Sequence, residues 1–480
     1  MKSKTGFFLS ALMLAACGGE TSKQSESVSA PSPAPNTTDS RPPTYLEGVY
    51  ATSSSPAHEV FDLFDDNPGT GWQTQEGSGP DEGIMIYFQN PVALQSVQVT
   101  PEEGSFQGEA AFMQTYVNGA LGAGGKPGDK IDLGKKAVKS LYLRFVKTGL
   151  EQTAKRERDG REIEIESYPG NAYIGIKELI VLNDKGESLR LVPPQRQIGN
   201  LSASSTLAPD IAYSPANLFD TRKEFGWVEG NKTSAGEGET LNFEFEEPVN
   251  ITAIQIWNGY QRSSEHFAAN ARVRNFEFGA KGGPMTAYTL SDSKTGQKIK
   301  LAAPLKGQSF ELKIKNIYPG KKYKDLAISD LVFFDGEQPF VVSSKLPEQN
   351  RANLRSQVGS SPLAQLFNRR ISNLLDDESG TITEQSLIIR SDGTFVLYSN
   401  EILPDDSESQ TLADGNWELV SSDEAGATIK VFGRWNNVSD FADYYRGKSV
   451  QNVTRIFSDE LTTDGNTVQG KKMVGMFYVR

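Results

Sequence analysis

Two similar stretches of sequence decide the fold: NLFDTRKEFGWVEG at residues 217–230 and DLFDDNPGTGWQ at residues 62–73. In both, Leu-Phe-Asp is followed by a tryptophan seven residues after the aspartate, Trp72 or Trp227. Alternating apolar and polar residues come next, as in strands with one buried face. Each copy then has a late Ile-x-acid-Leu strand, which begins at Ile176 or Ile328. The copies are offset by 155 residues at the tryptophans and by 152 at the late strands, which indicates duplication of a whole domain.

This pattern resembles the discoidin (coagulation-factor C-type, galactose-binding-like) jelly-roll family. The second copy is similar to a more specific branch, the glycan-binding module that accompanies some bacterial NAD glycohydrolase toxins. The matching segments are Asn217–Asp220, Phe225–Gly230, Gly238–Glu239, Asn258–Tyr260, Asn270–Val273 and Tyr318–Asp330. The first copy lacks the Asn-Gly-Tyr element and carries a charged insertion at 151–166. The resemblance therefore implies a β-sandwich for both copies and glycan binding for the second.

The N-terminus has the features of an export signal. Lys2 and Lys4 precede a short apolar run, and Leu14-Ala15-Ala16 leads to Cys17, the only cysteine of the chain. This arrangement resembles a bacterial lipoprotein signal, which is cut before a cysteine that then carries lipid such as palmitate. Because Gly18-Gly19 follows in place of an aspartate, we expect the outer membrane, with the protein facing the periplasm or the cell surface.

The predicted fold class is mainly β: two tandem jelly-roll β-sandwiches followed by a small α+β antiparallel barrel or sheet domain. The predicted divisions are a signal peptide at 1–16, a disordered tether at 17–45, sandwiches at 46–192 and 193–340, and the last domain at 341–480. Ser361-Pro362 and the apolar spacing after it predict an amphipathic helix up to about Leu375. Strands are expected from Gln385 to the C-terminus.

Sugar recognition needs planar polar side chains for hydroxyl groups and an aromatic ring for the apolar sugar face. The second copy supplies this mixture, and its predicted ligand-binding residues are Trp227, Glu229, Asn258, Tyr260, Asn270, Arg272, Tyr323 and Asp325. For the tryptophans of both copies, core packing is the favoured interpretation and stacking on a ligand is the alternative.

Many discoidin-type modules hold a structural calcium ion between the early aspartate loop and the late acidic strand. By this resemblance, the calcium ligands of the first copy would be Asp65, Asp66, Thr70 and Glu178. Asp220 and Asp330 are their counterparts in the second copy, where the neighbouring cations Arg222 and Lys223 disfavour calcium.

The net charge and the number of histidines limit the classes of function to consider. The formal net charge of −12, which becomes −14 without the two signal lysines, disfavours nucleic acid as a partner. The only histidines, His58 and His266, lie in different copies, so neither a catalytic triad nor a paired-histidine metal site is expected within one domain. We therefore expect no enzyme and no catalytic residue, and no cofactor beyond the calcium ion.

The favoured hypothesis is a surface-tethered lipoprotein that binds carbohydrate, or a host or envelope ligand, through its discoidin-like domains. The alternative is a structural or assembly scaffold of the cell envelope, in which the jelly rolls contact other proteins. A glycosidase is less favoured, since it would need two carboxylates at a separation that the sequence does not reveal.

Overall fold

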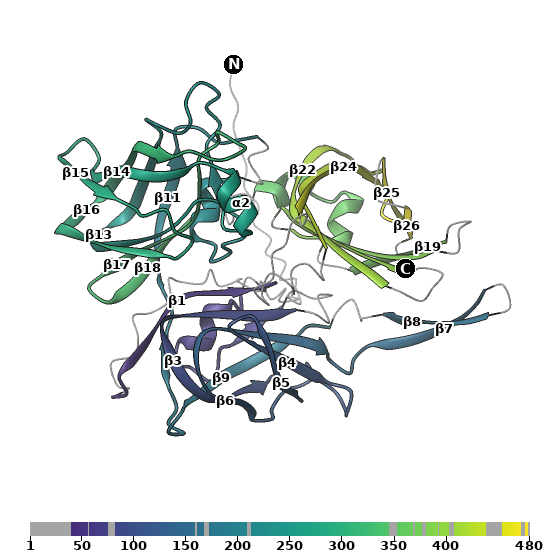
Figure 1. Cartoon of the computed structure of the whole chain (residues 1–480). Helices are drawn as coiled ribbons and strands as arrows, with labels where there is room; N and C mark the ends of the chain where they lie inside the picture. The colour runs from purple at the N-terminus through teal and green to yellow at the C-terminus, as the bar shows by residue number, and fades with distance from the viewer. Residues whose placement is uncertain are drawn as a thin grey trace, which may run out of the picture.

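The computed structural model describes residues 40–478 except 56, 75–81, 159–160, 168–171, 209–212, 345–352, 368–369, 377–380, 392, 403–407, 438–453 and 472–475. These residues form three units of eight strands each and a separate two-stranded hairpin (Figure 1). The predicted signal peptide and nearly all of the predicted tether lie outside the described residues. No helix in the described ranges has the length and apolar character needed to cross a bilayer.

The first unit runs from residue 43 to residue 192. Its elements are β1 (Pro43–Ala51), the 3₁₀ helix η1 (Val60–Phe64), β2 (Trp72–Gln73), β3 (Gly83–Pro101), β4 (Phe112–Val117), β5 (Ala120–Gly125), β6 (Ile131–Lys147), β9 (Gly175–Asn183) and β10 (Arg190–Val192). The charged insertion forms a hairpin of β7 (Gln152–Arg158) and β8 (Arg161–Ser167), which pair only with each other. Figure 1 shows this hairpin projecting from the unit.

The second unit repeats the first strand for strand. Its elements are β11 (Gln195–Ala203), η2 (Pro215–Phe219), β12 (Trp227–Val228), β13 (Thr240–Asn258), α2 (Ser264–Ala269), β14 (Arg272–Ala280), β15 (Met285–Thr289), β16 (Gln297–Tyr318), β17 (Ala327–Asp335) and β18 (Gln338–Ser343). The strand orders β10-β1-β3-β6-β4-β5 and β18-β11-β13-β16-β14-β15 correspond position by position. The parallel pairs β1–β10 and β11–β18 also correspond. The sequence-based prediction of a mainly β duplication is therefore confirmed.

The tryptophans of the two copies occupy equivalent places. Trp72 pairs with Ile176, and Trp227 pairs with Ile328, the first residues of the two late motifs. Each indole is fully buried in its core, and each Nε1 donates a 2.9 Å hydrogen bond to the carbonyl of a serine, Ser53 or Ser205. Of the two interpretations left open by the sequence, core packing is the one that the structure shows.

Long strands give each unit two layers. β13 pairs with β11 in its first half and with β17 in its second, with a register shift between Glu244 and Val249. β3 changes partner in the same way, from β1 to β9. Such a strand crosses from one sheet to the other at the irregularity, so the inner side chains of both layers face one core. In the second unit, phenylalanines dominate that core, among them Phe243, Phe278 and Phe333.

The third unit is an antiparallel meander in which strands adjacent in sequence also pair in space. Its elements are η3 (Pro362–Leu366), β19 (Arg370–Asp376), β20 (Ile382–Ile389), β21 (Thr394–Ile402), β22 (Glu408–Ser422), β23 (Ala427–Asn437), β24 (Thr454–Thr463), β25 (Thr467–Gly470) and β26 (Met476–Tyr478). β19 approaches β26, so the meander curls round its core (Figure 1).

The predicted helix from Ser361 to about Leu375 is wrong. Among the described residues of this stretch, helical structure is limited to η3, where Leu363 and Leu366 are buried as the spacing predicted. From Arg370 onward the chain pairs residue by residue with β20 instead. The apolar spacing suited a helix, but the open edge of the sheet offered a complete backbone hydrogen-bonding partner, and such tertiary pairing overrides local periodicity.

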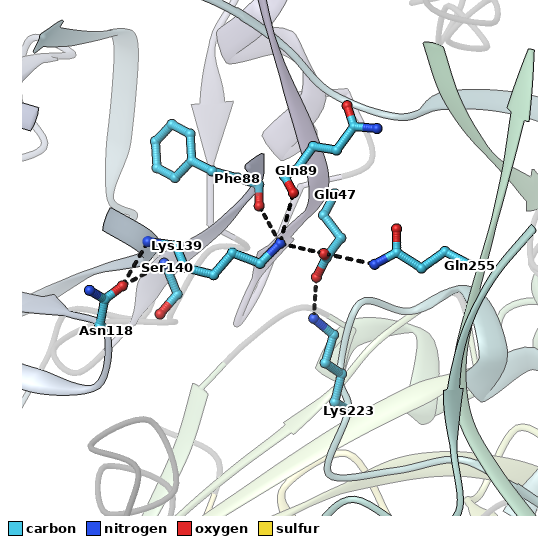
Figure 2. Close-up of polar contacts among 8 residues, drawn as sticks. All are labelled: Glu47, Phe88, Gln89, Asn118, Lys139, Ser140, Lys223 and Gln255. Carbon is cyan, nitrogen blue, oxygen red and sulfur yellow. Dashed lines mark hydrogen bonds and ion pairs between the residues drawn. The ribbon is translucent and has the colours of Figure 1, made fainter. Parts of the chain in front are cut away.

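The two sandwiches meet at a buried carboxylate. Glu47 of β1 is only 4% exposed, and its carboxylate accepts hydrogen bonds from Lys139 Nζ of β6 at 2.6 Å and from Gln255 Nε2 of β13 at 3.1 Å. Lys223, from the loop between η2 and β12, pairs with the other carboxylate oxygen (Figure 2). One donor therefore comes from the first sandwich and two come from the second.

Aromatic rings from both sandwiches surround the same lysine. The Lys223 ammonium lies 4.1 Å from the ring centroid of Tyr87 and 4.2 Å from that of Trp257, which belong to β3 and β13. Burial alone would raise the pKa of Glu47, but the attraction of Lys223 and Lys139 and their hydrogen bonds outweigh it and lower that pKa below its ordinary value. We call the group formed by Glu47 and the residues around it the junction: Lys139, Lys223, Gln255, Tyr87 and Trp257.

Disrupting one side of the junction should leave an uncompensated buried charge. We expect Lys223→Met and Glu47→Leu each to lower the free energy of unfolding by about 3 kcal/mol. The double variant should lose clearly less than the sum of the two, because the buried pair is then removed as a whole. Urea denaturation followed by fluorescence measures these values at neutral pH. The coupling should fade as pH falls through the lowered pKa of Glu47.

A matched control is Lys281→Met, which removes a lysine paired with Glu244 on the surface of the second sandwich. That change should cost less than about 1 kcal/mol. Strict additivity of the two junction substitutions would show that Lys223 and Glu47 do not stabilise each other.

Candidate functional site

Most of the predicted ligand residues gather at one end of the second sandwich. There β13 ends, β14 begins, β16 ends and β17 begins, and three loop segments converge: 229–238, 259–271 and 319–326. We call these segments the loop end. Backbone hydrogen bonds tie them together, from Glu229 N to Leu326 O at 3.0 Å and from Ala271 N to Asp325 O at 3.0 Å. The loop end is therefore part of the folded scaffold.

The short helix α2 anchors the segment 319–326. Ser263 caps its N-terminus by accepting from the backbone N–H of His266 at 3.1 Å. At the other end, the carbonyls of Ala268 and Ala269 accept from the backbone N–H groups of Lys321, Lys322 and Tyr323 at 2.8–3.0 Å. The segment thus supplies partners to carbonyls that a helix leaves unpaired.

Arg272 and Asn258 hold the loop end together from within. Arg272 is 7% exposed, forks onto both oxygens of Asp292 at 2.7 and 2.8 Å, and donates to the carbonyls of Asn270 and Pro319. Asn258 is fully buried and exchanges two hydrogen bonds with the backbone of Val273, at 2.7 and 2.9 Å. The polar atoms of these two side chains bind within the fold, and their direct contact with a sugar stays a prediction.

The other buried members also have partners inside the protein. The carboxylate of Glu229 accepts from Asn231 N at 2.6 Å, and burial raises its pKa although that hydrogen bond opposes the rise. Asn270 donates to the carbonyl of His266 at 2.9 Å. Tyr260 packs edge-on against the ring of His266 and is only 7% exposed. With Trp227 in the core, six of the eight predicted residues are buried.

Tyr323 and Asp325 are the two predicted residues that reach the surface. Tyr323 is 43% exposed, and Asp325 is half-buried. Three exposed lysines flank the tyrosine, at 321, 322 and 324. Sequence reasoning did not select these lysines as site residues, although the run Lys-Lys-Tyr-Lys in an acidic chain was a visible signal. The segment 319–326 thus presents a ring, cations and one carboxylate, while Glu237 and Glu265 are exposed on the other two segments of the loop end.

The predicted calcium ligands are not brought together. Thr70 Oγ1 donates to the carboxylate of Asp65 at 2.8 Å, so the loop closes on itself, and Asp66 adopts a left-handed backbone conformation with φ 58°. Glu178 is exposed on β9 beside Thr100. In the described ranges, no three His, Cys, Asp or Glu side chains lie close enough to hold a metal ion.

A cavity of about 340 Å³ lies between the two sandwiches, away from the loop end. Its lining includes the rings of Tyr50, Phe61 and Phe219 and the carboxylates of Glu59 and Asp220. None of the eight predicted ligand residues lines it. The cavity is therefore a separate feature of the contact between the copies.

Comparison with known proteins supports the class of fold. Residues 195–334 match the family model described as the NAD glycohydrolase translocation F5/8 type C domain. The second sandwich is accordingly similar to discoidin-like domains of the F5/8 type C class, as the resemblance in the sequence predicted. No curated protein sequence matched the chain.

Parts of the chain are also similar to three solved structures. The family 32 carbohydrate-binding module of C. perfringens NanJ in complex with galactose is 13% identical and covers 28% of this chain and 93% of that chain, with a TM-score of 0.23. A pectin-binding module is 16% identical, with coverages of 31% and 99% and a TM-score of 0.22. A mutant of the arabinofuranosyltransferase AftD from Mycobacteria is 10% identical, with a TM-score of 0.25. The match covers 80% of this chain and only 39% of the length of the arabinofuranosyltransferase.

Asp330, the late acidic residue of the second copy, should behave as a neutral buried group. Burial raises its pKa well above the ordinary value, and Lys223 only partly opposes this. A raised pKa in the folded state means that the contribution to stability is full at low pH and is lost as pH rises through that pKa. Asp330→Asn cannot ionise, so the melting temperature of the variant minus that of the wild type should increase between pH 4 and pH 8.

Thermal melts over that pH range measure the difference, with Asp184→Asn on an exposed turn as the control. A difference that stays constant or decreases with pH would show that Asp330 is ionised in the folded protein.

Proposed function

We propose that this protein is a non-enzymatic carbohydrate-binding protein whose ligand contacts the loop end of the second sandwich. The proposal is carried by Tyr323, a ring that is 43% exposed on a segment whose backbone is hydrogen-bonded to α2. Tyrosine is enriched among the residues that carry most of the binding energy of recognition surfaces. The match of this part of the chain to a discoidin-like domain supports the proposal.

The geometry suits a sugar at the level of single groups. The face of the tyrosine ring can cover the apolar C–H side of a pyranose, and Asp325 can accept from a pair of hydroxyl groups. Because Arg272 and the α2 carbonyls already hold the segment in place, little conformational entropy is lost when a ligand binds. The buried residues predicted from sequence thus act as positioning residues, and the surface ones as contacts.

Removing the exposed ring tests this function. We expect Tyr323→Ala to weaken glycan binding at least tenfold, which corresponds to about 1.4 kcal/mol, with the melting temperature nearly unchanged. A glycan array identifies the ligand, and calorimetry measures the affinity. The matched control is Phe112→Ala, since Phe112 of the first sandwich is 38% exposed and the change removes a similar ring.

Two results would contradict the proposal. One is an unchanged affinity in Tyr323→Ala. The other is the absence of any glycan signal together with co-purification of the protein with an envelope complex, which would favour the alternative of a protein-binding scaffold.

We further propose that lipid on Cys17 tethers the binding unit to the cell envelope, with the polar segment up to residue 42, where the predicted tether meets β1, as a spacer. The motif Leu14-Ala15-Ala16-Cys17 supports this proposal. Cys17→Ser should move the protein from the membrane fraction to the soluble fraction or leave its signal uncleaved, as cell fractionation and mass spectrometry would show. Normal cleavage and membrane partitioning in that variant would refute lipid anchoring.

A further inference from the structure

The surface around Tyr323 carries a concentration of positive charge. Lys321, Lys322 and Lys324 are all exposed, and within the part of the chain that the structure describes no carboxylate pairs with them. Elsewhere in the same sandwich, Lys281, Lys298 and Lys315 each pair with a glutamate, whereas the exposed Lys300 and Lys306 have no carboxylate partner among the described residues. The formal net charge of the chain is −12. A group of three neighbouring lysines without carboxylate partners is therefore a local positive patch on an acidic protein.

The lysines stand on a segment with little freedom to move. A Cβ added at Gly320 would lie 2.4 Å from the carbonyl oxygen of Ala269, so only glycine permits this close approach to α2. Arg272 donates to the carbonyl of Pro319 at 3.2 Å, one residue before that glycine. The Lys322 ammonium lies 4.9 Å from the centroid of the Tyr323 ring, so the charge and the ring are presented together. The backbone N–H groups of 321–323 are already bonded to α2, which leaves recognition to the side chains.

We propose that the loop end selects acidic polysaccharides, whose sugars carry carboxylate groups. This inference rests on the proposed function and names the ligand class for the same surface. Fixed cations can bind the carboxylates, the tyrosine can cover a ring face, and Asp325 can accept from the hydroxyl groups of the same sugars. A neutral glycan would leave three mutually repelling cations without counter-charges.

The same surface fits nucleic acids and anionic membranes less well. The chain as a whole is acidic, whereas binding to nucleic acid or to an anionic bilayer draws on a broad positive field. Only one large ring is exposed on the loop end, and stacking of successive bases needs several.

Binding to three acidic polymers, polygalacturonate, alginate and hyaluronan, tests the inference with the full-length protein. Methyl-esterified polygalacturonate is the matched neutral ligand, because it has the same backbone without the charge. At least one acidic polymer should bind, and its affinity should fall steeply between 50 and 500 mM salt. The triple variant Lys321→Gln/Lys322→Gln/Lys324→Gln should bind it at least tenfold more weakly.

The control Lys130→Gln/Lys136→Gln/Lys177→Gln removes the same charge from exposed positions of the first sandwich and should bind like the wild type. Equal loss in both triple variants, or equal binding of the esterified polymer, would overturn the inference. Tyr323-dependent binding of neutral glycans with no binding of the acidic polymers would overturn it and leave the proposed function standing. Absence of binding to every glycan would overturn both. Tighter binding to single-stranded DNA or anionic vesicles, lost in the loop variant, would replace it with another ligand class.

Discussion

The arrangement of the two sandwiches depends on the buried carboxylate of Glu47. Removing an ion from water costs several kcal/mol unless partners surround it, and here the partners come from both copies. Lys223 must reach Glu47 and also lie between Tyr87 and Trp257, so one side chain constrains the position of three elements. The duplicated domains therefore meet in one defined way. The loop between η2 and β12, which carries Lys223, forms part of that contact.

That loop shows how duplicated sequences came to serve different roles. Asp66 and Thr221 occupy equivalent positions and share a left-handed backbone, with φ values of 58° and 64°. The conformation is unfavourable for a β-branched threonine, yet Thr221 fits against Gly48, where an added Cβ would lie 2.3 Å from its Cγ2. In the first copy the loop closes on Asp65; in the second it docks on the neighbouring sandwich. Lys223 thus lies in the loop of the second copy that corresponds to the predicted calcium-binding loop of the first.

The repeat, the strand alternation and the tryptophan positions could be predicted because they depend on local pattern and on core burial. The partners of polar side chains could not, because Arg272 and Asp292 meet only through the fold. A polar residue in a binding motif looks the same in sequence whether it contacts a ligand or supports the loop that does. The exposure of a side chain helps to distinguish a ligand contact from a supporting residue. Of the eight predicted residues, only Tyr323 and Asp325 reach the surface. The helix expected before Leu375 failed for a related reason, since edge pairing with β20 is a long-range property.

The junction and the loop end are also physically continuous. Arg262 donates to the carbonyl of Glu224, one residue beyond Lys223, and its guanidinium lies 4.9 Å from the Tyr260 ring centroid. Tyr260 in turn contacts His266 of α2, the helix on which the segment bearing Tyr323 rests. The segment that fixes the two sandwiches is thus in contact with the scaffold that positions the candidate site. A junction held by buried contacts therefore favours a preformed site, which the proposed binding of a sugar through a small number of exposed contacts would require.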